Sequence, residues 1–334
     1  MQLRLENIGM IKEADVAIDG LTVIAGENDT GKSTVGKSLF LVFKYAQEFT
    51  SAEHKFEYYF KMEKLLFETP LKNGSLWIDD KCLIKRVPDQ PIIEMDASVK
   101  IAVTDVMMIE TPVVWNFFKF FNAIEKIKTE ASFFDQNYQI PYPYLMWDIY
   151  RKLSLPKQEE IKLSDKKSLL DQIESIIKGK FTKDDFGDFV FVKENKKVPI
   201  INTATGIKQF GILQKLIENN YLHQKSIVIF DEPEVHLHPK WQLKMAELIV
   251  MLVQNGVKIV VNSHSPYMIE ALKRYAERDN RDNIDNKTNF YLAENGYIGQ
   301  TNGSNSETLR EIFEKLSEPF EKFDEMDMEN ILNG

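Results

Sequence analysis

A segment near the N-terminus has the residue types and spacing of a phosphate-binding loop. Gly26-Glu27-Asn28-Asp29-Thr30-Gly31-Lys32-Ser33 fits the pattern G-x-x-x-x-G-K-[ST]. The glycines let backbone N–H groups curl toward phosphate oxygens, and the start of a following helix adds positive potential. Lys32 is expected to reach the β- and γ-phosphates of ATP, and the Ser33 hydroxyl to ligate Mg²⁺. Thr34 is either a second hydroxyl near the α-phosphate or an ordinary residue of the first helical turn.

A second candidate for this chemistry is an acidic pair that follows an apolar run. Residues 226–230 read Ser-Ile-Val-Ile-Phe, and Asp231-Glu232 come directly after them. Ligands of open parallel sheets lie beyond the carboxyl ends of the strands. Asp231 is therefore expected to hold Mg²⁺ through water, and Glu232 to orient or deprotonate an attacking water. A solvated acidic pair after a core strand is the alternative for this motif on its own.

The patterns around both motifs predict an α/β fold. The phosphate loop stands between an apolar strand at 21–25 and an amphipathic helix at 31–47, after alternating strands at 2–7 and 14–18. Downstream, strands and helices alternate as in a largely parallel sheet. The expected order is a hairpin at 189–201, helix 206–219, strand 226–230, helix 239–254, strand 257–261, helix 266–276 and an edge hairpin at 290–300.

Changes in composition and pattern along the sequence divide the chain into four expected parts. An N-terminal ATPase lobe spans 1–48, and a lysine- and aromatic-rich, mostly helical insertion spans 49–185. A C-terminal lobe at 186–302 and an acidic helical tail at 303–334 complete the chain. Within the insertion we expect a small β region at 74–78, 81–87 and 99–103, a buried strand inside 106–112, and helices at 113–128, 144–153 and 158–178. The insertion phenylalanines are expected either in the core or on a docking surface.

Composition excludes several protein classes. The 334 residues are 43% hydrophobic and 28% charged, which is typical of globular proteins, and no apolar run is long enough to span a membrane. A single cysteine, Cys82, rules out an internal disulfide framework, and no signal peptide is recognisable, so we expect a cytoplasmic protein. The net charge of −9 argues against a nucleic-acid binder with a wholly basic surface.

Four motifs together resemble one family. They are Asp231-Glu232-Pro233-Glu234-Val235-His236-Leu237-His238-Pro239, Asn262-Ser263-His264-Ser265-Pro266, Thr203-Ala204-Thr205-Gly206-Ile207-Lys208-Gln209, and Leu5-Glu6-Asn7-Ile8-Gly9 ahead of the phosphate loop. In this order they resemble the ABC-type AAA ATPases, which include the ATPase parts of OLD-family nucleases and of bacterial anti-phage defence systems. The resemblance covers roughly residues 1–45 and 198–300. It implies an ABC-type P-loop NTPase head with a mixed, largely parallel sheet, an N-terminal antiparallel β region and a helical insertion.

The resemblance also implies roles for further residues. His264 becomes the switch histidine that contacts the γ-phosphate and, with Lys32 and Glu232, a catalytic residue; an ordinary loop histidine is the alternative. Thr205, Gly206 and Lys208 form a signature segment that acts on the nucleotide of a second subunit, although Lys208 can instead be a solvated helix residue. Residues 234–238 form a loop across that dimer interface, and His236 with His238 is a weaker candidate for a metal pair. Glu110 stands where the family has a glutamine, and Lys12 is either near nucleotide or a solvated turn residue.

The function implied is that of an ATPase that dimerises around ATP and Mg²⁺ and gates a partner effector, such as a nuclease encoded nearby, in anti-phage defence. No nuclease domain is evident, since only about seventy residues follow His264, less than a typical domain. The alternative is a DNA-repair or recombination ATPase of the RecF or Rad50 type that binds DNA directly, through lysines at 178–183 and 193–197. A transporter subunit is disfavoured by the departure from the transporter signature.

Overall fold

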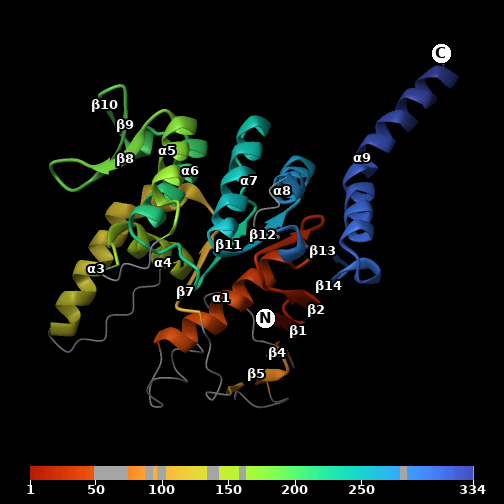
Figure 1. Cartoon of the computed structure of the whole chain (residues 1–334), viewed down its shortest axis with the longest axis horizontal. Helices are drawn as coiled ribbons and strands as arrows, with labels where there is room; N and C mark the ends of the chain where they lie inside the picture. The colour runs from red at the N-terminus through yellow and green to blue at the C-terminus, as the bar shows by residue number, and fades with distance from the viewer. Residues whose placement is uncertain are drawn as a thin grey trace.

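The computed structural model describes residues 1–48, 74–86, 93–95, 103–133, 143–157, 163–278 and 284–333 (Figure 1). Its centre is a mixed sheet in the order β6-β5-β4-β1-β2-β14-β13-β3-β12-β11-β7. The strands are β1 (Gln2–Ile8), β2 (Ile11–Ala17), β3 (Leu21–Ala25), β4 (Ser75–Ile78), β5 (Lys81–Arg86), β6 (Ile93–Met95), β7 (Asp105–Ile109), β11 (Ser226–Asp231), β12 (Lys258–Ser263), β13 (Thr288–Glu294) and β14 (Tyr297–Gly299).

The strands that carry the motifs form the parallel half of this sheet. β13, β3, β12, β11 and β7 are parallel neighbours. Their carboxyl ends therefore meet at one edge, where the phosphate loop follows β3 and the acidic pair follows β11. The phosphate loop between a strand and a helix of a mixed α/β sheet confirms the predicted fold class.

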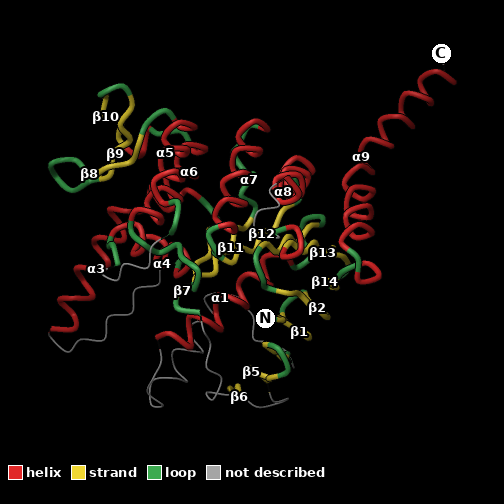
Figure 2. Tube along the Cα trace, viewed as in Figure 1, coloured by secondary structure: helices red, strands yellow, loops and turns green. Residues whose placement is uncertain are grey.

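Helices cover the parallel half on both faces (Figures 1 and 2). Side chains that alternate along one strand enter two different cores, because successive residues of a strand point to opposite faces. Ile227 and Ile229 pack with α1 (Lys32–Glu48), whereas Val228 and Phe230 join the core of the helices on the other face. Those helices include α6 (Thr205–Glu218), α7 (Pro239–Gln254) and α8 (Pro266–Arg278). The bounds of α7 are those predicted from the sequence, 239–254.

Strands of the predicted insertion extend the N-terminal part of the sheet. β4 pairs antiparallel with β1, and β5 and β6 follow it, which confirms the N-terminal antiparallel β region. The strand predicted at 99–103 falls largely outside the described residues, and Val103 itself is not in a strand. The division of the chain at 48 and 185 stays a prediction.

The remaining helices of the insertion are α3 (Phe118–Phe133), α4 (Tyr144–Ser154) and α5 (Lys166–Ile177). α4 and α5 pack against α6, and α3 packs against α4. The helix expected from 113 starts as a 3-10 turn, Pro112–Phe117, because Thr111 and Pro112 open it with a side-chain cap. Phe118 and Phe121 pack in the aromatic core around Trp115 and Tyr150, whereas Phe117 and Phe120 stay partly exposed. Phe134 lies outside the described residues.

A separate three-stranded antiparallel sheet follows α5. It consists of β8 (Lys180–Lys183), β9 (Phe189–Lys193) and β10 (Lys196–Pro199) in the order β10-β9-β8. The β9–β10 hairpin is as predicted, but the sequence pattern did not reveal β8. Gly179 permits it, since a Cβ there would lie 2.4 Å from the Val192 carbonyl oxygen.

The C-terminal hairpin corrects one prediction. The strands expected at 290–293 and 297–300 exist as β13 and β14, but they do not form an edge. β13 pairs with β3 and β14 pairs with β2, so the hairpin joins the parallel and antiparallel halves of the sheet. Alternation of apolar and polar residues reveals a hairpin in the sequence, but it does not reveal which strands lie beside that hairpin in the sheet. The acidic tail forms α9 (Asn305–Asn333) as expected. Within the described residues, the chain has no helix with the length and apolarity needed to span a bilayer.

Candidate nucleotide-binding site

The phosphate loop has a backbone that only glycine satisfies at its two ends. Gly26 has a φ of 155°, and a Cβ there would lie 2.3 Å from the Ala293 carbonyl oxygen. Gly31 has a φ of 95°, and its Cβ would lie 3.0 Å from Ile11 Cγ1. Glu27, Asn28 and Asp29 are exposed on the loop between them. The Thr30 hydroxyl closes the loop by donating to the Glu27 carbonyl over 2.9 Å. The loop is thus a preformed cradle at the start of α1.

Lys32 lies buried under this cradle. Its ammonium donates to the carbonyl oxygens of Gly26, over 2.9 Å, and Glu27, over 2.5 Å. Burial lowers the pKa of Lys32, while the charges of Glu232 and Asp231 act in the opposite direction. A buried cation held by neutral carbonyls gains stronger, charge-assisted hydrogen bonds when phosphate oxygens replace them.

Ser33 and Asp231 meet across the groove although 198 positions separate them. The Ser33 hydroxyl donates to Asp231 Oδ1 over 3.0 Å. Gly36 allows this approach, because its missing Cβ would lie only 2.8 Å from Ile229 Cγ2 and so brings α1 close against β11. The same Asp231 oxygen accepts the Asn262 amide over 2.7 Å. The structure therefore brings together the two predicted Mg²⁺ ligands and adds Asn262, a positioning residue that was not among the predicted site residues.

Glu232 and His264 are neighbours at the ends of β11 and β12. His264 Nδ1 lies 3.1 Å from Glu232 Oε1, and the Glu232 N–H donates to the Asn262 carbonyl over 2.9 Å. Glu232 has a positive φ of 52°, a left-handed conformation that is uncommon for a non-glycine residue. Both side chains remain partly exposed. The base and the switch histidine predicted from the sequence thus face one another beside the acidic strand end.

Glu234 begins the loop at 234–238 that is predicted to cross a dimer interface, a prediction that stays open. Its own side chain points into its own subunit and is 4% exposed. Glu234 Oε1 accepts the Ser263 hydroxyl over 2.6 Å and the backbone N–H groups of His264 and Ser265 over 3.0 and 3.1 Å. Burial raises the pKa of Glu234, and these hydrogen bonds oppose that shift. Three donors on one oxygen hold the turn that presents His264.

From this geometry we predict that Glu234 positions His264 for the ATP hydrolysis expected of this site. Glu234→Ala is expected to lower kcat about 10²-fold with the KM for ATP within a few-fold of wild type, because a misplaced switch affects the reaction more than binding. Glu234→Gln keeps a carbonyl acceptor and should recover most of kcat. Steady-state phosphate release measures both, with Glu277→Ala on exposed α8 surface as the control. A Gln variant as slow as the Ala variant would contradict the positioning role.

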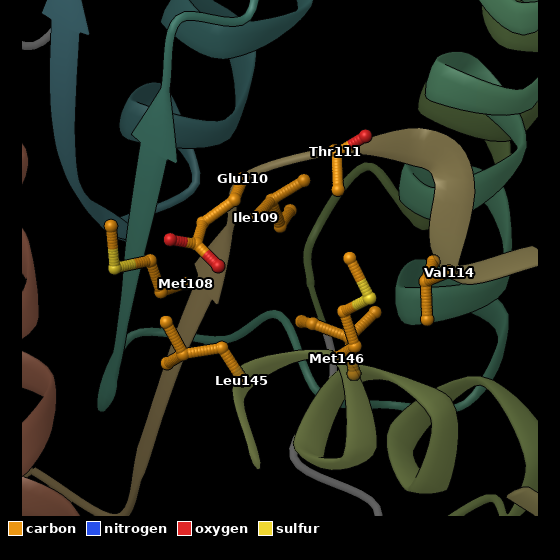
Figure 3. Close-up of a pocket in the computed structure, with 8 residues that line it drawn as sticks. Met108, Ile109, Glu110, Thr111, Val114, Leu145 and Met146 are labelled. Atoms are coloured by element: carbon orange, nitrogen blue, oxygen red, sulfur yellow. The ribbon is translucent and has the colours of Figure 1, made fainter. Parts of the chain in front are cut away.

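Glu110 directly follows β7 and lies beside the same site. Its carboxylate pairs with Lys37 of α1 at 3.4 Å. Burial raises the pKa of Glu110; Lys37 opposes this shift, and the charge of Asp231 adds to it. Figure 3 shows the side chain lining a mostly apolar pocket with Met108, Leu145 and Met146. Glu110 is therefore close enough to Asp231, the proposed metal ligand, for their charges to interact, and it forms an ion pair with Lys37.

The predicted signature segment begins α6. Thr205 and Gly206 are half-exposed at its first turn, and Ala204 gives no side-chain cap to the free N–H groups. A Cβ on Gly206 would lie 3.2 Å from the His236 carbonyl oxygen, so the signature packs against the loop after the acidic pair. An uncapped helix start with exposed N–H groups suits an anion.

Lys208 is not a solvated helix residue, which was the alternative to its signature role. It is 4% exposed, its ammonium donates to Asn116 Oδ1 over 2.8 Å, and burial lowers its pKa. Its predicted contact with the nucleotide of a partner would require the side chain to leave Asn116. Lys12 contacts no part of the cradle in any described interaction; its ammonium lies 5.2 Å from the Tyr297 ring centroid.

Buried polar atoms without partners gather at this site. Among the described residues, four buried side-chain atoms make no hydrogen bond: Glu234 Oε2, Asn262 Oδ1 and His264 Nδ1 belong to the acidic and switch motifs, and Gln209 Oε1 belongs to α6. Such atoms are rare in native interiors and call for a bound water, ion or ligand. Together with the Gly26 cradle and the hydroxyl–carboxylate pair, they fit a nucleotide with Mg²⁺. Among the described residues no group of three His, Cys, Asp or Glu side chains could hold a metal, so the His236–His238 pair gains no support.

Comparisons with known proteins agree with these motifs. A family model described as an AAA ATPase domain matches residues 118–269, a range that includes the acidic pair and the switch. The Septu protein PtuA of Bacillus thuringiensis is 20% identical over 300 residues, covering 81% of this chain and 72% of PtuA. The Retron Vc95 probable ATPase of Vibrio cholerae serotype O1 biovar El Tor is 26% identical over 129 residues, which are 34% of this chain and 24% of that protein.

Among solved structures, an SMC head bound to the C-terminal winged-helix domain of ScpA gives a TM-score of 0.46 at 12% identity, with coverage of 89% of this chain and 95% of that one. The family match covers the acidic pair and the switch, whereas this likeness concerns backbone shape. The family match confirms the resemblance to AAA ATPases, and the two sequence relatives are a Septu protein and a probable ATPase of a retron.

Proposed function

We propose that the chain binds ATP with Mg²⁺ and hydrolyses it. The observation that carries this proposal is the contact between Ser33 and Asp231 across the groove, above a buried Lys32. A hydroxyl and a carboxylate so placed are the ligand types that Mg²⁺ takes in P-loop sites. When bound, Mg²⁺ neutralises developing phosphate charge. Lys32 exchanges its loop carbonyls for phosphate oxygens, and the N–H groups of residues 27–34 hold the triphosphate.

In this proposal Glu232 and His264 act on the attacking water. Glu232 accepts the water's proton as a general base. His264, whose Nδ1 stands 3.1 Å from Glu232 Oε1, contacts the γ-phosphate in this proposal. Glu234 keeps His264 in place, and Asn262 keeps Asp231 in place. The water oxygen bonds to the γ-phosphorus as the bond to the bridging β-phosphate oxygen breaks, ADP leaves with that electron pair, and the proton ends on Glu232.

We propose further that two copies close around two ATP molecules. Thr205, Gly206 and Lys208 of one copy then face the γ-phosphate bound by the other, an isologous interface of two-fold symmetry. The uncapped start of α6 and its packing against the loop at 234–238 support this, because both belong to one exposed surface with Val235 and His236.

Dimerisation has a direct test. With ATP and Mg²⁺, Glu232→Gln is expected to elute at twice the monomer mass of 38.9 kDa, because a nucleotide that is not hydrolysed keeps the interface closed. Light scattering after gel filtration measures the mass. Wild type without nucleotide serves as the control and should remain monomeric. A Glu232→Gln protein that binds ATP yet stays at 38.9 kDa would remove the dimer from the proposal.

The biological role proposed is anti-phage defence in the cytoplasm, in which the ATPase gates a partner effector such as a nuclease encoded nearby. The similarity to the Septu protein PtuA over 81% of the chain supports this role. Affinity purification from the native host, with identification of proteins encoded in neighbouring genes, tests it; absence of any such partner would count against gating. A DNA-repair ATPase of the RecF or Rad50 type is the second candidate.

A further inference from the structure

The three-stranded sheet β8–β10 gathers lysines from two separate runs of the sequence. Figure 1 shows this sheet projecting at one end of the molecule beside α5 and α6. Its strand register sets Lys180 and Lys197 on either side of Val192, and places Lys193 directly opposite Lys196. Lys178, the left-handed residue that ends α5, precedes the sheet. We call these five exposed lysines the basic end; they are Lys178, Lys180, Lys193, Lys196 and Lys197.

One face of this sheet is occupied by the protein core. Phe181, Phe189 and Phe191 are buried there, and Phe181 and Phe189 pack on Trp115. Because side chains alternate along each strand, Lys180 and Lys197 emerge on the opposite face with Val192 between them. Flanking strands of a sheet stand about 10 Å apart, which places two cations within reach of one polyanion. The sheet therefore buries aromatic rings on one face and presents Lys180 and Lys197 on the other, whereas Lys193 and Lys196 follow Phe191 on the first face, at the exposed end beyond the rings.

The charges of the sheet are sorted toward its two ends. The β8–β9 turn holds Asp184, Asp185 and Asp188, and the first of these caps the backbone of the turn. The basic end lies at the other end of the strands and contains one acid, Glu194. Among the described residues, only Lys197 of the basic end makes an ion pair, with Asp185 at 3.6 Å between exposed side chains. Positive charge is therefore concentrated at the basic end, although the whole chain has a net charge of −9.

This arrangement is locally unfavourable without a counter-charge. Like charges directly opposite each other on paired strands destabilise a sheet, and Lys193 and Lys196 stand in that relation. A phosphate backbone offers closely spaced anions that neutralise such a set, with release of its counterions. The lysines are exposed, so they can contact phosphate groups, but they are not arranged to recognise particular bases. We propose that the basic end of the β8–β10 sheet binds the phosphate backbone of nucleic acid without sequence preference.

Salt-dependent binding tests this proposal. Fluorescence anisotropy of the full chain without nucleotide is measured with a labelled DNA duplex and, separately, a single-stranded RNA. The logarithm of the binding constant is expected to fall with the logarithm of salt with a slope of about −3 to −4 for the duplex. Lys193→Ala with Lys196→Ala should weaken binding about tenfold at low salt and reduce that slope by about 2. Lys81→Ala with Lys225→Ala, two exposed lysines elsewhere, is the matched control.

The outcomes separate the proposal from its alternatives. Binding of both probes supports a contact with phosphates alone, whereas binding of one probe shows that its helical form is also recognised. If the alanine pair unfolds, Lys193→Arg with Lys196→Arg must retain the wild-type slope. Wild-type protein that binds neither probe, or an alanine pair that matches the control pair, would overturn the proposal. Because no nucleotide is present, failure of the ATPase would leave this result unaffected.

Discussion

Glu232→Gln is expected to lower kcat for ATP hydrolysis about 10³-fold while the affinity for ATP changes little. The substitution keeps the shape and the hydrogen bond of the Glu232 N–H to the Asn262 carbonyl. It removes the only carboxylate that the described residues place within 3.1 Å of His264 Nδ1, and with it the proton acceptor. Phosphate release at saturating Mg²⁺ and ATP measures kcat, and calorimetry measures affinity.

The control for this variant is Glu277→Gln, on the exposed surface of α8. It keeps the same change of charge and should hydrolyse ATP as wild type does. A Glu232→Gln protein with wild-type turnover would mean that another group accepts the proton. A variant that loses binding and turnover together would mean that Glu232 contributes to the site as a structural element.

Lys32→Ala is expected to weaken ATP binding about 10²-fold or more. Its ammonium is the cation under the cradle, already within hydrogen-bond distance of the Gly26 and Glu27 carbonyls. Charge-assisted hydrogen bonds to phosphate are stronger than those to neutral carbonyls, so the alanine variant loses more in the bound state than in the free one.

The measurement is a calorimetric titration of ATP with Mg²⁺, with exposed Lys225→Ala as the comparison. Removal of Lys32 also relieves a buried cation whose pKa is lowered by burial, so the unfolding temperature of the variant should not fall. An unchanged affinity in Lys32→Ala would show that the nucleotide does not enter this loop.

The sequence predicted the parts of the site that are contiguous in the chain. The cradle at 26–33 and the strand before Asp231 are local patterns, because glycine conformations and strand burial depend on neighbouring residues. The exact bounds of α7 follow in the same way from Pro239 at its first turn.

Pairings between distant segments could not be predicted in this way. Asn262 bonds Asp231 because β11 and β12 are parallel and bring residues 231 and 262 into register. Glu234 caps the switch turn because Ser263 ends β12 beside it. Neither pairing has a local signal, although both residues stand inside motifs that the family resemblance marked. The burial of the Glu234 side chain also had no local signal, and the interface role of residues 234–238 stays a prediction.

Lys208 shows the same limit at the signature. Its position in α6 allowed a solvated or a nucleotide-facing side chain, and periodicity could not choose between them. The structure covers it with the aromatic core, where Trp115 donates to the Lys208 carbonyl and Asn116 accepts from its ammonium. The residues that bury it come from a turn 93 positions earlier in the chain. The action of Lys208 on the nucleotide of a second subunit stays a prediction.

The account depends most on where the triphosphate lies. A crystal structure of Glu232→Gln with ATP and Mg²⁺ tests this directly. We expect the β- and γ-phosphates against the N–H groups of residues 27–32, Lys32 turned from the Gly26 carbonyl to the phosphates, and Mg²⁺ between Ser33 and Asp231. A nucleotide bound elsewhere, or Lys32 still bonded to Gly26 beneath an empty loop, would contradict the account.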